Sequence, residues 1–95
     1  MANQISGNPW VLDTAAAAAV KLGRVKVAAI EWEAYSAASD TMVMKDTSKS
    51  PAREVVNFLG HTDKSPVCTN FGEGVWLQDL ALTQISSGNV KVFIK

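Results

Sequence analysis

The hydrophobic positions of this chain recur mostly at every second residue, which is the spacing typical of β-strands. Within residues 24–34 the alternation changes phase before Trp32, so we expect a long strand that contains a β-bulge or is covered at its far end. Residues 40–46 predict a short strand that carries Met42 and Met44 on one face. Further strand-like stretches lie at residues 9–14, 55–59, 66–71, 74–82 and 90–95.

About six to seven short strands, separated by Gly, Pro, Ser and Asp, predict an all-β fold. That number suits a small antiparallel β-sandwich of jelly-roll-like type. A chain of 95 residues has room for one core, so we expect a single β domain over residues 9–95 after a polar, flexible arm at residues 1–8. The final strand is expected to pair with residues 74–82, and residues 45–54 are expected to form an exposed loop.

The alanine-rich segment before the long strand allows two interpretations. Alanine favours a short helix over residues 15–22, which Asp13 or Thr14 would cap and Gly23 would end. A helix this short needs packing that alanine methyl groups supply poorly. Both interpretations remain open from the residues alone, and the extended form is favoured.

Three tryptophans in 95 residues supply large apolar surfaces for a core or an interface. An uninterrupted period of two places Trp76 on the same face as Leu80 and Leu82, so Trp32 and Trp76 are predicted in the core. Trp10 follows a polar start and fits a core or an interface equally well. The residues that we single out as interface candidates are Gln4, Ile5, Pro9, Trp10, Leu12 and Trp76.

The composition is 47% hydrophobic and 19% charged, with nine basic and nine acidic residues, which indicates a folded chain of zero net charge. This balance predicts no nucleic-acid partner and favours self-association. The single cysteine indicates synthesis in a reducing cytoplasm. We expect no membrane association, because the sequence contains no signal-peptide pattern and no run of eighteen apolar residues.

The residues capable of chemistry are few and do not form a recognisable motif. Glu31 and Glu33 share one face of a strand, but they are expected to be solvated acids rather than a general acid and base. His61 beside Asp63 is interpreted as a polar turn, and Cys68 as a small hydrophobic residue of a strand. The sequence therefore predicts no enzyme, no metal site and no cofactor.

Four stretches carry a resemblance that extends over nearly the whole chain: NPWVLDTA, VKVAAIEW, SAASDTMVMKD and EGVWLQDLALTQISSGNVKVFIK. They resemble a family of small virion structural proteins of tailed bacteriophages, which are similar to head decoration or cement proteins. The chain departs from that family where the longer DTSKSPAR replaces a short Asp-x-x-Gly connection, and where Asp79 replaces a glycine. The matching positions are Asn8, Pro9, Trp10, Ile30, Trp32, Asp40, Val75, Trp76, Ser87 and Gly88.

The resemblance implies a β-sandwich component of the virion, made in the host bacterial cytoplasm, with capsid decoration or cementing as its role. Its partners would be the major capsid protein or other virion proteins, and it would form a homo-oligomer. The segment of residues 1–8 is expected to cross onto a neighbouring subunit or the shell. Two alternatives are a structural component of the neck, tail or fibre base, and a small carbohydrate-binding module in which Trp76 and Gln78 contact the sugar.

Overall fold

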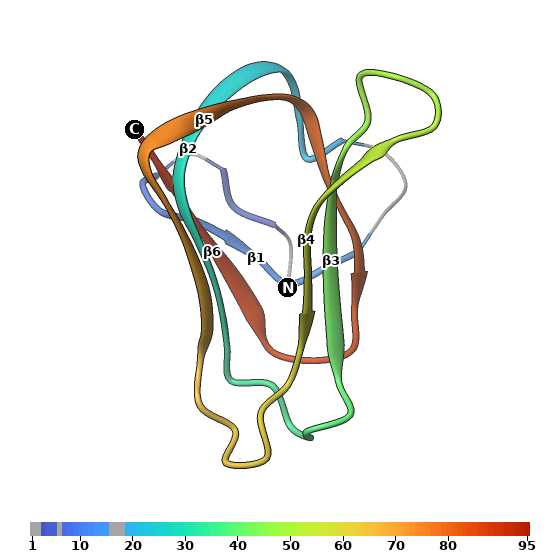
Figure 1. Cartoon of the computed structure of the whole chain (residues 1–95), viewed down its shortest axis with the longest axis vertical. Coiled ribbons are helices and arrows are strands. Elements are labelled where there is room, and N and C mark those ends of the chain that lie inside the picture. Colours follow the sequence, from blue (N-terminus) through green and yellow to red (C-terminus); the bar gives the residue numbers. More distant parts are fainter. Residues whose placement is uncertain (1–2, 6, 16–18) are drawn as a thin grey trace.

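The computed structural model describes residues 3–5, 7–15 and 19–95, and in these residues it contains six antiparallel β-strands and no helix. The predicted all-β class and the number of strands are confirmed. The fold is a small, compact β-sandwich-like globule (Figure 1). The strands are β1 (Trp10–Leu12), β2 (Lys21–Glu33), β3 (Thr41–Asp46), β4 (Arg53–Leu59), β5 (Val67–Ile85) and β6 (Asn89–Ile94).

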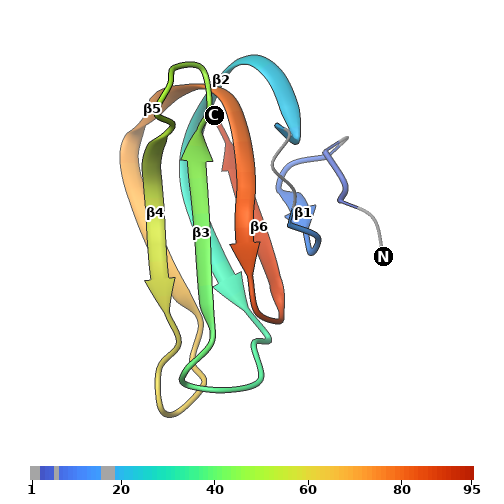
Figure 2. The ribbon, with the colours of Figure 1, turned by 90° about the vertical axis from the view of Figure 1, so that its right-hand side faces the viewer.

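All six strands belong to one continuous sheet in the order β1-β6-β2-β5-β3-β4. The sheet closes over a core because β5, with 19 residues, serves two ladders: Val67 to Leu80 pairs with β2, and Leu80 to Ile85 pairs with β3. Figure 1 shows β5 arching over one end of the molecule between these ladders. In the side view of Figure 2 the strands run along the long axis of the molecule.

The phase change predicted in the long strand is present in β2. Val25 and Val27 are buried, and the buried side chains then resume at Ile30 and Trp32. The pairing of β2 shifts register between Val27 and Ala29 with both of its neighbours, which marks a bulge. One extra residue at the bulge returns the apolar side chains to the core, because successive side chains of a strand point to opposite faces.

A second change of face occurs in β5 at Asp79, and it overturns the prediction that Trp76 is buried. Leu77 is buried before this point and Leu80 and Leu82 after it, whereas Trp76 is 55% exposed. Asp79 has a φ of 51°, a left-handed conformation that is uncommon outside glycine and reverses which face the following residues occupy. The change was missed because the sequence was read with an unbroken period of two.

The core gathers side chains from both ladders around Trp32, which is fully buried as predicted. The Trp32 ring stacks on Tyr35 with a centroid distance of 4.3 Å, and its Nε1–H donates a hydrogen bond of 2.9 Å to the Ser87 carbonyl. The Tyr35 hydroxyl donates to the Ser65 carbonyl and accepts a 2.8 Å bond from the His61 backbone N–H. These contacts join the end of β2 to the turns at residues 61–65 and 86–88.

The prediction that the final strand pairs with residues 74–82 is wrong. Strand β6 lies between β1 and β2, with Val92 opposite Trp10 and Val90 opposite Trp32. The turn before β6 crosses from one ladder to the other instead of closing a hairpin with β5. Gly88 lies in this turn with a φ of 80°. It packs against the backbone of residues 33–35 so closely that an added Cβ would lie 2.7 Å from the backbone nitrogen of Tyr35.

The described residues before β2 form no helix. The helix considered for residues 15–22 is not formed at Ala15 or at residues 19–22, and β2 begins at Lys21; residues 16–18 lie outside the described residues. The physical reason is that β2 pairs with β5 from its first residue, Lys21 opposite Leu80. This tertiary ladder takes up the end of the segment that a helix over residues 15–22 would have needed.

The described part of the N-terminal segment contacts the same chain. Gln4 forms a two-way backbone bridge with Val11, and the Asn3 side chain bonds the backbone of Asp13 and Thr14. The Asn8 amide exchanges two hydrogen bonds, of 2.8 and 2.9 Å, with the backbone of Ile94. A crossing of this segment onto another molecule stays a prediction.

The two tryptophans with opposite burial allow a matched test of the core. We expect Trp32→Ala to lower the free energy of unfolding by about 3 to 5 kcal/mol, because it empties a buried site and removes the stacking on Tyr35. Trp76→Ala is expected to change it by no more than about 0.5 kcal/mol. Urea unfolding followed by circular dichroism measures both, and similar losses in the two variants would contradict this core.

A second matched pair tests the turn before β6. Gly88→Ala and Gly72→Ala both place a side chain at a positive φ, but only the methyl group at residue 88 would overlap the backbone. We expect Gly72→Ala to lower the free energy of unfolding by about 1 kcal/mol because of its positive φ alone. Gly88→Ala is expected to lower it by at least about 1 kcal/mol more. Equal unfolding midpoints in urea would show that the turn is not packed against residues 33–35.

Candidate functional site

The acids of β2 do not face a cleft. Glu31 and Glu33 are partly buried on the strand, and Glu33 Oε1 lies 2.7 Å from Lys91 Nζ on β6. The hydrogen bond from Lys91 to Glu33 raises the pKa of the lysine, so the lysine keeps its positive charge. This arrangement is that of a partly exposed cross-strand ion pair.

His61, Asp63 and Cys68 do not come together as a catalytic group. His61 and Asp63 are exposed in a turn, where the hydrogen bond from the Ser65 backbone is the main cause that lowers the pKa of Asp63. Cys68 lies in β5 as predicted, but its side chain is exposed rather than packed. In the described ranges, no three His, Cys, Asp or Glu side chains are grouped as a metal site would require, and no helix there could span a membrane.

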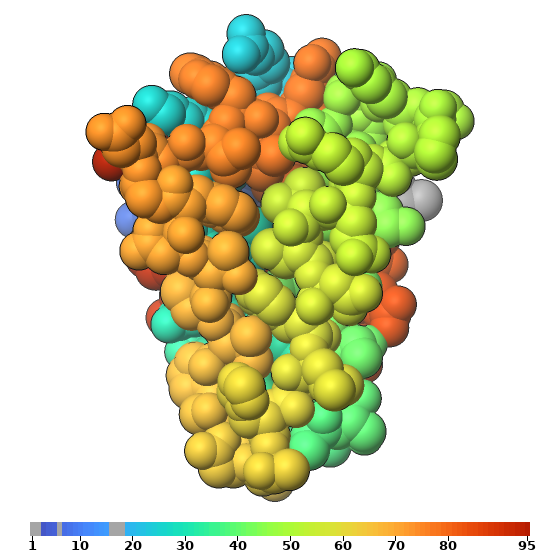
Figure 3. Space-filling view, viewed as in Figure 1, coloured from blue at the N-terminus to red at the C-terminus, as the bar shows by residue number. Residues whose placement is uncertain are grey.

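A cleft of about 270 Å³ lies at the end of the molecule where β5 arches. One wall is the outer face of β2 and β5, and the other is the β3–β4 loop of residues 47–52. Figure 3 shows these parts at the same end, with β5 in orange and the loop in yellow-green. The lining residues are Arg24, Asp46, Ser48, Lys49, Arg53, Trp76, Leu77 and Gln78.

The first wall is built by the change of face at Asp79. Because Leu77 points into the core, its neighbours Trp76 and Gln78 point outward, opposite Lys26 and Arg24 in the ladder. The Arg24 guanidinium carbon lies 4.9 Å from the centroid of the Trp76 ring, and Lys26 Nζ lies 6.0 Å from it. Cation–π attraction holds a ring that is half exposed between two positive charges.

The base of the cleft is the buried carboxylate of Asp46, which is 8% exposed. One oxygen accepts hydrogen bonds from the backbone and hydroxyl of Ser48, and the other accepts a 3.1 Å bond from the Gln78 N–H. Arg53 Nη2 lies 3.6 Å from the same carboxylate. These donors, Ser48 first, hold the pKa of Asp46 below its ordinary value despite burial.

The second wall, the β3–β4 loop, is attached to β5 through the first residue of the loop, Thr47. The backbone N–H and the hydroxyl of Thr47 both donate to the carbonyl oxygen of Asp79, at 3.1 and 2.6 Å. The Asp79 carboxylate accepts a 2.7 Å bond from Gly23 N–H in β2. Asp79 therefore connects both walls of the cleft, although the sequence marked it only as a departure from a glycine.

The cleft is electropositive although the chain is neutral. Its lining contains three cationic side chains, Arg24, Lys49 and Arg53, against the single carboxylate of Asp46, a formal excess of two positive charges. Low-dielectric walls concentrate such a field, so the cleft favours an anionic group. Sequence reasoning missed the cleft because its residues come from three separate parts of the chain, and the only signals were Trp76 and the predicted loop at residues 45–54. That loop is shorter than predicted, because β3 extends to the buried Asp46 and β4 begins at Arg53.

The predicted interface residues do not form one surface. Trp10 and Leu12 are buried in the core of this chain at 4% and 0% exposure, so their side chains present almost no surface to a partner. Gln4 and Ile5 are exposed and Pro9 is partly exposed near β1, and Trp76 lies on β5, which β6 and β2 separate from β1 in the sheet. An interface through these residues stays untested.

Leu22 is an exposed residue that the sequence analysis did not select. It is 79% exposed and lies in the bulge of β2 between Lys21 and Arg24, opposite Asp79. Leu22 precedes Arg24, which lines the cleft, by two residues in β2. The sequence had assigned Leu22 to the alanine-rich segment, where its side-chain direction was undefined.

The buried carboxylate gives the cleft a testable pH dependence. Because the folded pKa of Asp46 is below the ordinary value of 3.8, its contribution to stability is fully present above that value and is lost as the pH falls through the folded pKa. We expect Asp46→Asn to lower the unfolding free energy by about 1 to 2 kcal/mol at neutral pH. Urea titrations should show the difference from the native protein shrinking below about pH 4. A difference that stays constant with pH would contradict this assignment.

Comparison with known proteins gave no match among family models, curated proteins or solved structures. The functional interpretation below therefore depends on the residues of this chain and on the resemblance in its sequence pattern.

Proposed function

We propose that this protein is a noncatalytic structural component of a tailed-bacteriophage particle that docks onto other virion proteins as a capsid decoration or cement protein. The observation that carries the proposal is the exposed pair of Trp76 and Leu22 at one end of a well-packed sandwich. Exposed large apolar side chains on a rigid sheet mark interaction sites, and tryptophan is enriched among the residues that dominate binding energy.

The backbone supports the resemblance at two positions. The family has a glycine where this chain has Asp79, and that residue adopts a φ of 51°, a conformation that glycine adopts most easily. The Ser-Gly turn of the family corresponds to Ser87 and Gly88, where Gly88 has a φ of 80° and no room for a side chain. A β-sandwich-like fold is also what the resemblance implies.

The arrangement suits docking in many copies. The apolar surface of Trp76 and Leu22 is small, so the affinity of one molecule for a partner is expected to be modest. Attachment at many equivalent sites of a shell, with contacts between neighbouring copies, multiplies modest affinities. The major capsid protein is accordingly the proposed partner, and a homo-oligomer on the shell is the proposed assembly.

Binding to purified, undecorated capsids tests the proposal. We expect Trp76→Ala and Leu22→Ser each to weaken cosedimentation with capsids about ten-fold, because both remove apolar contact area at the docking surface. The matched control is Leu59→Ser, which removes a similarly exposed leucine from the end of β4, far from β5's arch, and should bind normally (Figure 1).

The number of copies per particle separates the structural alternatives. A copy number that matches the number of capsid subunits supports decoration of the head. A copy number that matches the symmetry of the neck or tail would instead indicate a structural component of the neck or tail. Absence of capsid binding by the native protein, together with binding to a glycan array that Trp76→Ala abolishes, would replace the proposal with a carbohydrate-binding role.

A further inference from the structure

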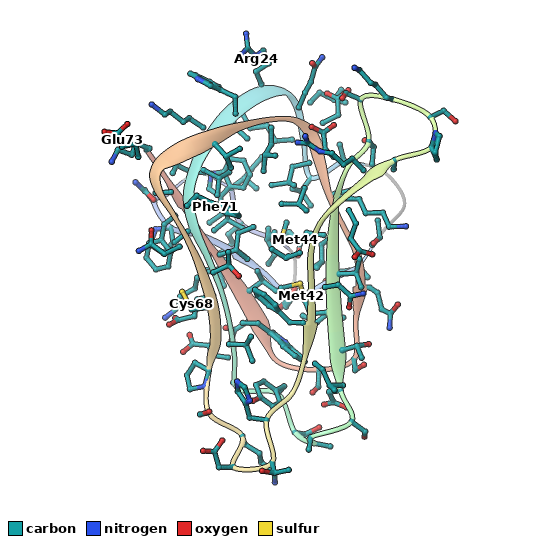
Figure 4. The ribbon with its side chains drawn as sticks, in the orientation of Figure 1. Arg24, Met42, Met44, Cys68, Phe71 and Glu73 are labelled. Carbon is teal, nitrogen blue, oxygen red and sulfur yellow. The ribbon has the colours of Figure 1, made fainter. Side chains whose placement is uncertain are left out.

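The cations of the cleft have unused binding capacity. Among the described residues, no carboxylate lies within ion-pair distance of Arg24 or Lys49. Arg53 is paired with Asp46 through Nη2, at 3.6 Å. Arg24 projects from the top of the molecule, whereas Glu73, an acid of the same end, projects from its side (Figure 4). The guanidinium groups therefore keep donors free for a carboxylate from outside the chain.

The apolar part of the site lies directly beside these charges. The Arg24 guanidinium is in contact with the Trp76 ring, which remains 55% exposed, and Leu22 precedes Arg24 by two residues. An incoming segment can therefore meet a cation and an apolar surface within a few ångströms of each other. This combination fits an acidic side chain with an apolar neighbour better than it fits a uniformly charged polymer.

The dimensions of the cleft favour a protein segment over a small molecule. Its volume of about 270 Å³ falls below the roughly 300 to 1,000 Å³ that encloses a typical small-molecule ligand. A nucleic acid would require a larger basic surface than an excess of two charges on a neutral chain. One or two side chains of a partner protein match both the volume and the charge.

We propose that the cleft between the β3–β4 loop and the outer face of β2 and β5 binds an acidic segment of the partner protein. A carboxylate of the segment is held by Arg24, Lys49 and Arg53, and an adjacent apolar side chain packs on Trp76. The inference rests on the proposed docking function and adds the chemistry of the partner. Asp46 acts as a positioning residue. It accepts hydrogen bonds from Ser48 in the loop and from Gln78 in β5, and it forms an ion pair with Arg53.

Charge removal on the full chain tests the inference. We expect the double variant Arg24→Gln, Lys49→Gln to bind undecorated capsids about ten-fold more weakly than the native protein. The control is Lys64→Gln, which removes an exposed lysine from the 61–64 turn, outside the cleft lining. Circular dichroism verifies that each variant is folded. Binding by the native protein should also weaken about ten-fold between about 0.05 and 0.5 M NaCl, which tests the cleft without any substitution.

A direct probe uses the exposed tryptophan. Trp10 and Trp32 are buried, so a change in fluorescence on binding at the surface reports on Trp76. A short peptide in which glutamate alternates with leucine is expected to change this emission and to compete with capsids, whereas the same peptide with lysine in place of glutamate is not. Equal competition by dextran sulfate at the same charge would indicate unspecific attraction of polyanions and overturn the inference.

The outcomes separate this inference from the function on which it rests. If neither the double variant nor salt weakens capsid binding, the proposal that the cleft binds an acidic segment is overturned, and the docking function stays in place. Failure of the native protein to bind any capsid or virion protein would overturn the docking function itself and, with it, the partner inferred for the cleft.

Discussion

The structure depends on one strand taking part in two ladders. Strand β5 leaves β2 and joins β3 at Leu80, directly after Asp79 has reversed its buried face. This reversal lets one sheet fold over its own core, and it also turns Trp76 to the solvent. The left-handed conformation is supported by hydrogen bonds on both sides of the residue, from Gly23 to the Asp79 carboxylate and from Thr47 to its carbonyl. The bend in the fold and the exposure of the aromatic side chain thus have the same cause.

The two ends of the sandwich are built differently. At one end the stacked Trp32 and Tyr35 join β2 to two turns through partly buried hydrogen bonds. At the other end the polar bonds of Asp46 and Asp79 hold the cleft walls while leaving Arg24, Lys49 and Trp76 accessible. A well-packed end that stabilises the fold and a polar end that presents charges and an aromatic ring suit the docking function that we propose. A well-packed domain loses little conformational entropy on binding.

The candidate site was only partly predictable. The sequence identified Trp76 as an interface candidate and predicted an exposed loop at residues 45–54, of which residues 47–52 lie between β3 and β4; both border the cleft. It did not indicate that Arg24 would lie over the Trp76 ring or that Asp46 would be buried beneath them, because these contacts join segments distant along the chain. Trp10 and Leu12 were also interface candidates, because apolar side chains fit a core as well as an interface. The ladder of β1 with β6 places both side chains in the core.

By itself, the sequence determined the all-β class, the change of phase in β2 and the burial of Trp32, because the alternation of side chains is a local property of a strand. The tertiary structure alone decided that β6 lies between β1 and β2, that no helix forms at residues 19–22, and that Trp76 faces the solvent. The physical reason is that pairing partners and a left-handed residue such as Asp79 are selected by the hydrogen bonds and packing of distant segments. No periodicity within a single strand contains that information.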